Sequence, residues 1–217
     1  IRSKLGPPTL PHTGFGTALF DADLDGDLDV AVANGRVRRR DGLDSAPPDP
    51  AGRFTQTYGE GNYMAQNGGT GAFSDACTGN AFCQGAHVSR GLIAADLDGD
   101  GDLDITVTNA NGPAQVFENR TPRKGRWLRA RLYDPRLQRD AIGARLSIRV
   151  GSRWFVGTAL HSMSYLASAD GSVHIGLGDV PGIDEVVVRW PGGSLEGFSS
   201  PGLDSYVEFV KGEGHKP

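Results

Sequence analysis

The sequence predicts an all-β protein, and three observations support this fold class. Glycine and proline number 32 and 13 among 217 residues, about a fifth of the chain and without a collagen period, which is typical of short strands joined by tight turns rather than of helical bundles. Short apolar and β-branched runs alternate with turn-forming residues along the chain. In addition, one segment of the first half occurs twice, and each copy reads as strand, acidic loop and strand.

The repeated segment spans residues 15–34 and 90–109, which align without a gap at an offset of 75 positions. In both copies a short apolar run enters an acidic loop and a β-branched run leaves it, which is the pattern of two strands joined by a tight loop. The predicted strands are Thr17–Phe20 and Val30–Ala33 in the first copy, and Leu92–Ala95 and Ile105–Thr108 in the second.

Turn residues follow each copy, at Asn34-Gly35 and at Asn111-Gly112-Pro113. Residues 36–62 read as a loop, and we interpret its Arg38-Arg39-Arg40 triplet as solvated rather than as a binding patch. A proline-rich stretch, Pro47-Pro48-Asp49-Pro50, lies in the same loop. The further predicted strands are Asn62–Gln66, a hairpin partner at Ala72–Ser74 reached through residues 67–71, and Gln115–Glu118.

From about Arg126 the acidic loop no longer recurs, and short strands continue to the end of the chain. These strands are Trp127–Leu132, Arg145–Val150, Trp154–Thr158, Val173–Ile175, Glu185–Trp190 and Tyr206–Val210. The turns between them include Gly151-Ser152, Gly176-Leu177-Gly178, Pro181-Gly182 and Pro191-Gly192-Gly193. We therefore expect two domains, residues 1–120 with the two repeats and residues 124–211 as a second all-β domain.

The formal net charge of −4 is unevenly distributed. Ten of the 26 acidic residues lie in Asp21–Asp29 and Asp96–Asp104, so the rest of the chain carries 22 basic and 16 acidic side chains. The basic residues are scattered, which argues against a nucleic-acid surface. No apolar run approaches the roughly 20 residues of a membrane helix. Because the sequence starts at Ile1 without an initiator methionine, we expect a processed product or a piece of a longer chain.

Each acidic window has the spacing of a metal-binding loop. Aspartates stand at relative positions 1, 3, 5 and 9, and a glycine at position 6 permits the backbone to curl so that alternate side chains converge. The residue at position 7 is expected to offer its backbone carbonyl. The predicted carboxylate ligands are Asp21, Asp23, Asp25 and Asp29 in the first loop and Asp96, Asp98, Asp100 and Asp104 in the second, and the predicted carbonyl ligands come from Asp27 and Asp102.

The donor set favours calcium. All predicted ligands are hard oxygens without a nearby Cys or His, which disfavours zinc and copper, and many anionic ligands on a flexible loop favour Ca²⁺ over Mg²⁺. The loops are not EF-hands, because Val32 and Val107 stand where the bidentate glutamate would be. We predict two Ca²⁺ sites; the alternative is a pair of solvated acidic turns, in which the crowded carboxylates repel each other without compensation.

The two cysteines, Cys77 and Cys83, lie in a Gly/Asn/Ser-rich stretch. Their spacing fits neither a redox CxxC motif nor a paired zinc knuckle. We expect a local disulfide rather than two free thiols, which favours an oxidising compartment.

The strand–DxDxDG–strand unit resembles the FG-GAP/VCBS repeat of integrin α-subunit propellers and many secreted bacterial proteins. Phe15-Gly16 stands where that family carries its Phe-Gly, and residues 67–73 resemble its hairpin between outer blade strands. The C-terminal part resembles the ASPIC/UnbV domain of the cartilage acidic protein-like family. That resemblance rests on Trp127-Leu128, Arg139–Arg145 (RDAIGAR), Ser164–Leu166 (SYL), His174–Gly178 (HIGLG) and Val186–Gly192 (VVVRWPG).

The resemblance implies β-propeller-type blades followed by a β-sandwich-like domain, in an extracellular or cell-surface protein that binds partners or matrix. Only two acidic repeats are present, whereas a propeller needs at least about four blades, so an incomplete propeller is expected. Either more blades precede Ile1, or the blade faces are buried against the C-terminal domain or against other copies. Head-to-tail burial between copies would build a filament, with Ile1–Pro11 as a strand lent to a neighbour or as a disordered end.

We therefore expect a calcium-binding, non-catalytic protein-binding or adhesion module, in which calcium is structural. The alternatives are a subunit that self-assembles through its β-edges and an accessory or enzymatic role in a biosynthetic pathway. An enzyme is not expected, because His161-Ser162 lacks a nucleophile elbow and His174 reads as a half-buried strand residue. Asn119-Arg120-Thr121 is a glycosylation sequon followed by Pro122.

Overall fold

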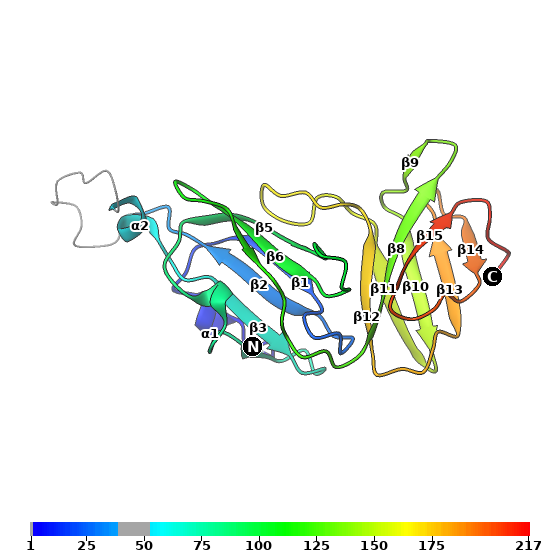
Figure 1. Cartoon of the computed structure of the whole chain (residues 1–217), viewed down its shortest axis with the longest axis horizontal. Helices are drawn as coiled ribbons and strands as arrows, with labels where there is room; N and C mark the ends of the chain where they lie inside the picture. The colour runs from blue at the N-terminus through cyan, green and yellow to red at the C-terminus, as the bar shows by residue number, and fades with distance from the viewer. Residues whose placement is uncertain (1, 39–52) are drawn as a thin grey trace.

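The computed structural model describes residues 2–38 and 53–217, and the regular structure in these ranges is mostly β-strand. The strands form four sheets in two groups, one built by the repeats and one by the chain from residue 126 onward (Figure 1). The predicted all-β class is therefore confirmed. Arg39, Arg40 and the proline-rich stretch at 47–50 lie outside the described residues.

Each repeat forms an antiparallel sheet. The first-repeat sheet has the order β1 (Gly14–Phe20), β2 (Asp29–Asn34), β3 (Tyr63–Asn67) and β4 (Phe73–Asp75), and the second-repeat sheet has the order β5 (Ser89–Ala95), β6 (Asp104–Asn109) and β7 (Gln115–Phe117). The registers coincide at the offset of 75, because Thr17 pairs with Val32 and Leu92 pairs with Val107. A bulge precedes both pairs, so the internal repeat is also a structural repeat.

The two repeat sheets pack against each other over a shared core. Buried apolar residues of both sheets form it, namely Phe20, Ala31, Ala33 and Met64 from the first and Leu92, Ile105 and Val107 from the second. The sheets approach closely at Gly16 of β1. A methyl group added to Gly16 would come within 2.7 Å of the Arg90 carbonyl and of the Leu92 Cβ on β5, so a side chain there would separate the sheets.

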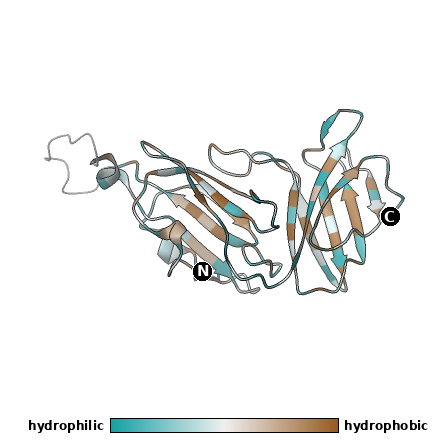
Figure 2. Ribbon diagram, in the orientation of Figure 1, coloured by the Kyte–Doolittle hydropathy of each residue, from teal (hydrophilic) through white to brown (hydrophobic). Residues whose placement is uncertain are grey.

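The chain from residue 126 onward forms two sheets around a larger core. One has the order β12 (Val173–Gly178), β8 (Arg126–Asp134), β15 (Ser205–Val210), with β9 (Arg139–Asp140) beside β8, and the other has the order β11 (Arg153–Thr158), β10 (Arg145–Val150), β13 (Glu185–Arg189), β14 (Leu195–Phe198). Apolar residues alternate along these strands (Figure 2). Their buried side chains, among them Leu128, Leu146, Ile148, Val188 and Trp190, form one cluster, and the arrangement is sandwich-like.

The connection from β11 to β12, residues 160–171, is here called the arm. It leaves the C-terminal sheets and reaches back to the repeat sheets (Figure 1). The Thr17 amide on β1 donates to Ser164 Oγ at 3.0 Å, and the rings of Phe15 and Tyr165 lie 5.1 Å apart. The arm therefore connects the two halves of the chain in addition to the linker before β8.

Two helical segments lie where the sequence predicts none. At the start, α1 (Gly6–Thr9) replaces the expected extended or disordered segment, because proline at its first positions has the φ that a helix requires. In the predicted loop 36–62, α2 (Arg53–Tyr58) begins the part that the structure describes again from residue 53. Its Phe54 and Tyr58 rings are four residues apart with centroids at 5.0 Å, and such a pair stabilises a short helix.

The predicted turn at Gly176–Gly178 is also wrong, because these residues continue β12 and pair with the start of β8. Leu177 between the glycines is 1% exposed, so it belongs to the core. The short strands β9 and β14 are not predicted either. Among the helices of the described ranges, none has the length and apolar character needed to cross a membrane.

Candidate metal loops between the repeats and the C-terminal domain

The first acidic loop, residues 21–29, gathers three carboxylates. Asp21, Asp23 and Asp29 each place one oxygen within 4.8 Å of the others, and all three residues are at most 4% exposed. The loop backbone holds them, because Asp21 accepts hydrogen bonds from the amides of Asp25 (3.1 Å) and Gly26 (2.7 Å). Gly26 has φ +89, a conformation that glycine adopts readily. The local sequence therefore directs these side chains inward.

The electrostatics of this cluster are unfavourable without a cation. Burial raises the pKa of Asp21 to about 7, opposed by the Gly26 amide and reinforced by the neighbouring aspartates. Burial likewise raises the pKa of Asp29 to about 6, against the hydrogen bonds that it accepts from the amides of Asn67 and Ala22. A group of three buried carboxylates, in which Asp21 and Asp29 resist ionisation, is an arrangement that a divalent cation stabilises.

One carboxylate oxygen of Asp23 has no hydrogen-bond partner among the described residues. Its Oδ2 accepts a hydrogen bond from Gln66 Nε2 and pairs with Lys124 Nζ at 2.6 Å. Its Oδ1 is buried and receives no hydrogen bond from the described part of the chain, and the residue is only 1% exposed. Because a buried oxygen of a carboxylate is costly to leave unpaired, Oδ1 is an available ligand atom of this group.

The second acidic loop, residues 96–104, repeats the backbone geometry of the first. Asp104 accepts from the amides of Leu97 (3.1 Å) and Asn119 (2.8 Å) as Asp29 accepts from those of Ala22 (3.0 Å) and Asn67 (2.7 Å). The three carboxylates that lie together are those of Asp96, Asp98 and Asp100, and the last two are exposed. The second loop is therefore the more open of the two candidate sites.

The predicted ligands outside the two groups have other partners. Asp25 accepts a hydrogen bond from the amide of Asp27, as Asp100 of the second group does from the amide of Asp102. Asp27 also pairs with Arg153 at 3.2 Å. Asp25, Asp27, Asp102 and Asp104 lie outside the two groups of converging carboxylates, whereas Asp29 lies inside its group.

The linker between the two halves brings a cation to each loop, which the sequence-based assignment missed. Arg123 pairs with Asp100 at 2.9 Å and with Asp102 at 2.8 Å, and Lys124 pairs with Asp23 and, at 3.6 Å, with Asp25. Burial raises the pKa of Asp102, and the Arg123 guanidinium opposes that rise. Two adjacent basic residues at the boundary between the two predicted domains are the signal that the sequence offers for this arrangement.

Two residues singled out in the sequence are bound to the loops. Asn119 of the sequon donates from its side-chain Nδ2 to the Ala22 carbonyl at 2.8 Å, so this amide has a structural role. His174 stacks on Trp127, and its Nε2 lies 2.8 Å from the Gly101 carbonyl in the second loop. Burial lowers the pKa of His174.

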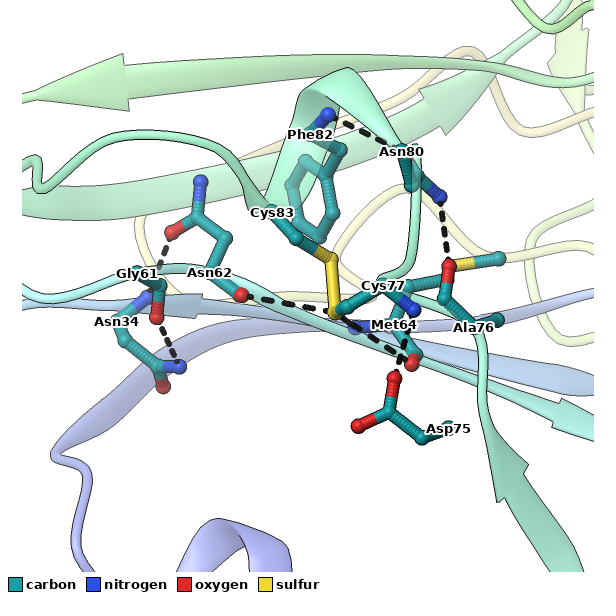
Figure 3. Close-up of a disulfide and its surroundings, with 10 residues drawn as sticks. All are labelled: Asn34, Gly61, Asn62, Met64, Asp75, Ala76, Cys77, Asn80, Phe82 and Cys83. Carbon is teal, nitrogen blue, oxygen red and sulfur yellow. Dashed lines mark hydrogen bonds between the residues drawn. A yellow bond between two sulfur atoms is a disulfide. The ribbon is translucent and has the colours of Figure 1, made fainter.

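A disulfide joins Cys77 and Cys83 beside the first-repeat sheet (Figure 3). The second cysteine ends the short 3₁₀ helix η1 (Ala81–Cys83), which Asn80 caps by accepting from the Phe82 amide. Phe82 is 2% exposed and belongs to the core of the repeats. The disulfide therefore holds a core side chain in place from outside the sheet.

The fold and the loops define an all-β protein with two acidic, oxygen-only loops in a structural repeat. Residues 134–216 match the family model described as ASPIC and UnbV, which spans β9 to β15 and covers less than half of the chain. The C-terminal part thus agrees with the family resemblance of its sequence. No match was found among curated proteins.

Proposed function

We propose that this protein is an extracellular, calcium-binding and non-catalytic protein-binding or adhesion module, in which two calcium ions stabilise the acidic loops. The observation that carries the proposal is the buried group Asp21, Asp23 and Asp29 with the unpaired Asp23 Oδ1. A cation between these oxygens would satisfy Oδ1 and remove the mutual repulsion.

The chemistry of the loops supports calcium in particular. Both groups of converging side chains consist of aspartates alone, without the His or Cys that zinc and copper prefer. The burial of the first group, at most 4% exposed at each aspartate, also supports a structural role for an ion there rather than catalysis. The Cys77–Cys83 disulfide supports an oxidising, extracellular compartment.

The proposed architecture is a pair of FG-GAP/VCBS-type blades followed by an ASPIC/UnbV domain. The matching registers of the two repeats and the glycine contact at the Phe15-Gly16 position support the blade assignment. In this arrangement the blades and the C-terminal domain present a surface to a protein or matrix partner. An accessory or enzymatic role in a biosynthetic pathway is a weaker alternative, because no observation favours a particular reaction.

Self-assembly into head-to-tail filaments is the second candidate function, and one surface bears on it. Ala31 and Ala33 on β2 are fully buried. The residues 75 positions later, on β6, are Thr106 and Thr108, and Thr108 is exposed. The arm also lies where a following blade would begin, because a methyl group on Gly91 would approach the carbonyls of the arm at 3.4–3.5 Å. Both features favour an end of the blade stack at the second repeat and hence a monomeric binding module.

Calorimetric titration of the chelator-treated chain with Ca²⁺ tests the proposal. We expect two binding events, and an Asp23→Asn variant should lose one of them, whereas Asp179→Asn, the same change at an exposed aspartate outside the loops, should keep both. Light scattering of the calcium-loaded chain should show a monomer. Absence of calcium binding would refute the metal proposal, and concentration-dependent filaments would favour the second candidate.

A further inference from the structure

We infer that the first acidic loop is a metal-dependent clasp between the repeats and the C-terminal domain, so that calcium there controls the docking of the two halves. The inference rests on the proposed calcium binding and adds a function for the ion. It concerns the first loop, because all three of its converging carboxylates are buried, whereas two of the three in the second loop are exposed.

The backbone of the first loop is hydrogen-bonded to the other half of the chain at successive positions. The carbonyls of Asp23 and Leu24 accept from the amides of Lys124 (2.7 Å) and Gly178 (3.0 Å). The Gly26 carbonyl accepts from Arg153 at 2.8 Å. These carbonyls belong to residues 23–26, among the predicted ligand residues 21–29, so one stretch of backbone positions both the carboxylates and the acceptors. A loop that relaxes without its ion would lose this row of acceptors.

Glycines in the C-terminal domain make room for the ligand residues. A methyl group on Gly176 would overlap the Asp21 carboxylate, and one on Gly178 would lie 3.0 Å from the Asp25 carbonyl. In the linker, a methyl group on Gly125 would overlap the Leu24 carbonyl. The glycines of β12 are therefore explained by close packing on the loop, and the C-terminal domain contacts the residues that would bind the ion.

The conformation and burial of Leu24 in the first loop indicate close packing between the repeats and the C-terminal domain. Its side chain is 0% exposed, and its φ of +62 lies in the left-handed region that leucine rarely adopts. This conformation persists only where the surroundings impose it. We therefore expect the ion, the strained residue and the docked β12 to form one cooperative unit.

Lys124 connects the charge of the loop to the linker. Its amide donates to the Asp23 carbonyl, while its ammonium pairs with the Asp23 carboxylate. Lys124 pairs with Asp23 and Asp25 and Arg153 pairs with Asp27, so two of the five loop aspartates, Asp21 and Asp29, have no basic partner among the described residues. The linker therefore orients Asp23 but does not replace a divalent ion.

Amide-resolved hydrogen exchange of the full chain, with Ca²⁺ or with EDTA, tests the clasp. We expect calcium removal to speed exchange of the Gly178 and Lys124 amides by at least about tenfold, a size within the usual range of coupling between sites. The amides of β10, in the core of the C-terminal sheets, should keep their protection. Asp98→Asn, which alters only the second loop, should leave exchange at Gly178 unchanged.

The reciprocal effect, that of docking on calcium affinity, is tested with a variant outside the first loop. Gly125→Ala, whose methyl group would overlap the Leu24 carbonyl and the Gly178 backbone, touches no predicted ligand, yet we expect it to weaken calcium binding at one of the two sites by about tenfold or more, since coupling between two equilibria is mutual. Gly182→Ala is the matched control, because a methyl group there meets nothing within 4 Å.

The outcomes distinguish the clasp from the proposed function. If two calcium ions bind but exchange at Gly178 and Lys124 is the same with and without calcium, the clasp is wrong and the calcium proposal stands. Equal acceleration at β10 also overturns it, because calcium would then stabilise the whole domain. If no calcium binds, both fail. The exchange comparison uses the wild-type chain, so it stands even if a variant does not fold.

Discussion

Raising the pH should destabilise the calcium-free chain, because two buried aspartates must ionise. The pKa of Asp21 is about 7 in the folded chain, against an ordinary value of 3.8. The folded state therefore binds this proton more tightly than the unfolded state, and stability falls as the pH rises from about 4 to about 7. Asp29, with a pKa of about 6, acts in the same direction.

The size of the effect follows from the pKa difference at Asp21. One pKa unit corresponds to about 1.4 kcal/mol, so the difference between 3.8 and about 7 corresponds to about 4 kcal/mol. This is a large part of the roughly 5–15 kcal/mol that stabilises a typical domain. The two aspartates interact, so their effects do not simply add.

Urea unfolding in EDTA at pH 5.0, 6.0, 7.0 and 7.5 measures this prediction, since most surface carboxylates are ionised throughout this range. His174, whose pKa is lowered by burial, changes stability in the opposite direction over it. An Asp21→Asn variant therefore isolates the aspartate, and its stability should fall less with pH than that of the wild type. Calcium should remove the decline, because it binds the ionised form. If the stability of calcium-free Asp21→Asn fell between pH 5.0 and 7.5 by as much as that of the wild type, the reasoning would be refuted.

Three further predictions concern stability and modification. Gly16→Ala should destabilise the chain by about 1–3 kcal/mol in urea unfolding, because the added methyl group overpacks the contact between β1 and β5. Gly68→Ala is the control and should change stability far less, because its methyl group meets nothing within 4 Å among the described residues. Equal effects of the two variants would contradict the packing argument. Replacing both Cys77 and Cys83 with serine should lower the free energy of unfolding by about 2 kcal/mol, the chain-entropy value for so short a loop. A variant as stable as the wild type would show that the disulfide contributes little. Asn119 should stay unglycosylated in a eukaryotic secretory host, because its side-chain amide donates to the Ala22 carbonyl, and an intact mass that includes an N-glycan would disprove this.

The strands of this protein are largely predictable because their signals are local. The predicted strand at Arg145–Val150 coincides with β10, and the strands that flank both acidic loops differ from β1, β2, β5 and β6 only at their ends. Strand ends depend on pairing with a neighbour, which short-range patterns do not contain. The helical turn of α1 and the continuation of β12 through Gly176–Gly178 were missed because glycine and proline fit both turns and regular elements.

The sequence by itself determined the repeat, the all-β class and the two acidic loops, because residues a few positions apart encode each of these features. Only the tertiary structure decided which carboxylates converge, since Asp29 joins Asp21 and Asp23 whereas Asp104 stays apart from its group. The tertiary structure alone also places Lys124 and Gly176 on the first loop, from about 100 and 150 residues away in the chain. Such contacts arise from the packing of two separately formed cores, and no local spacing in the sequence records that packing.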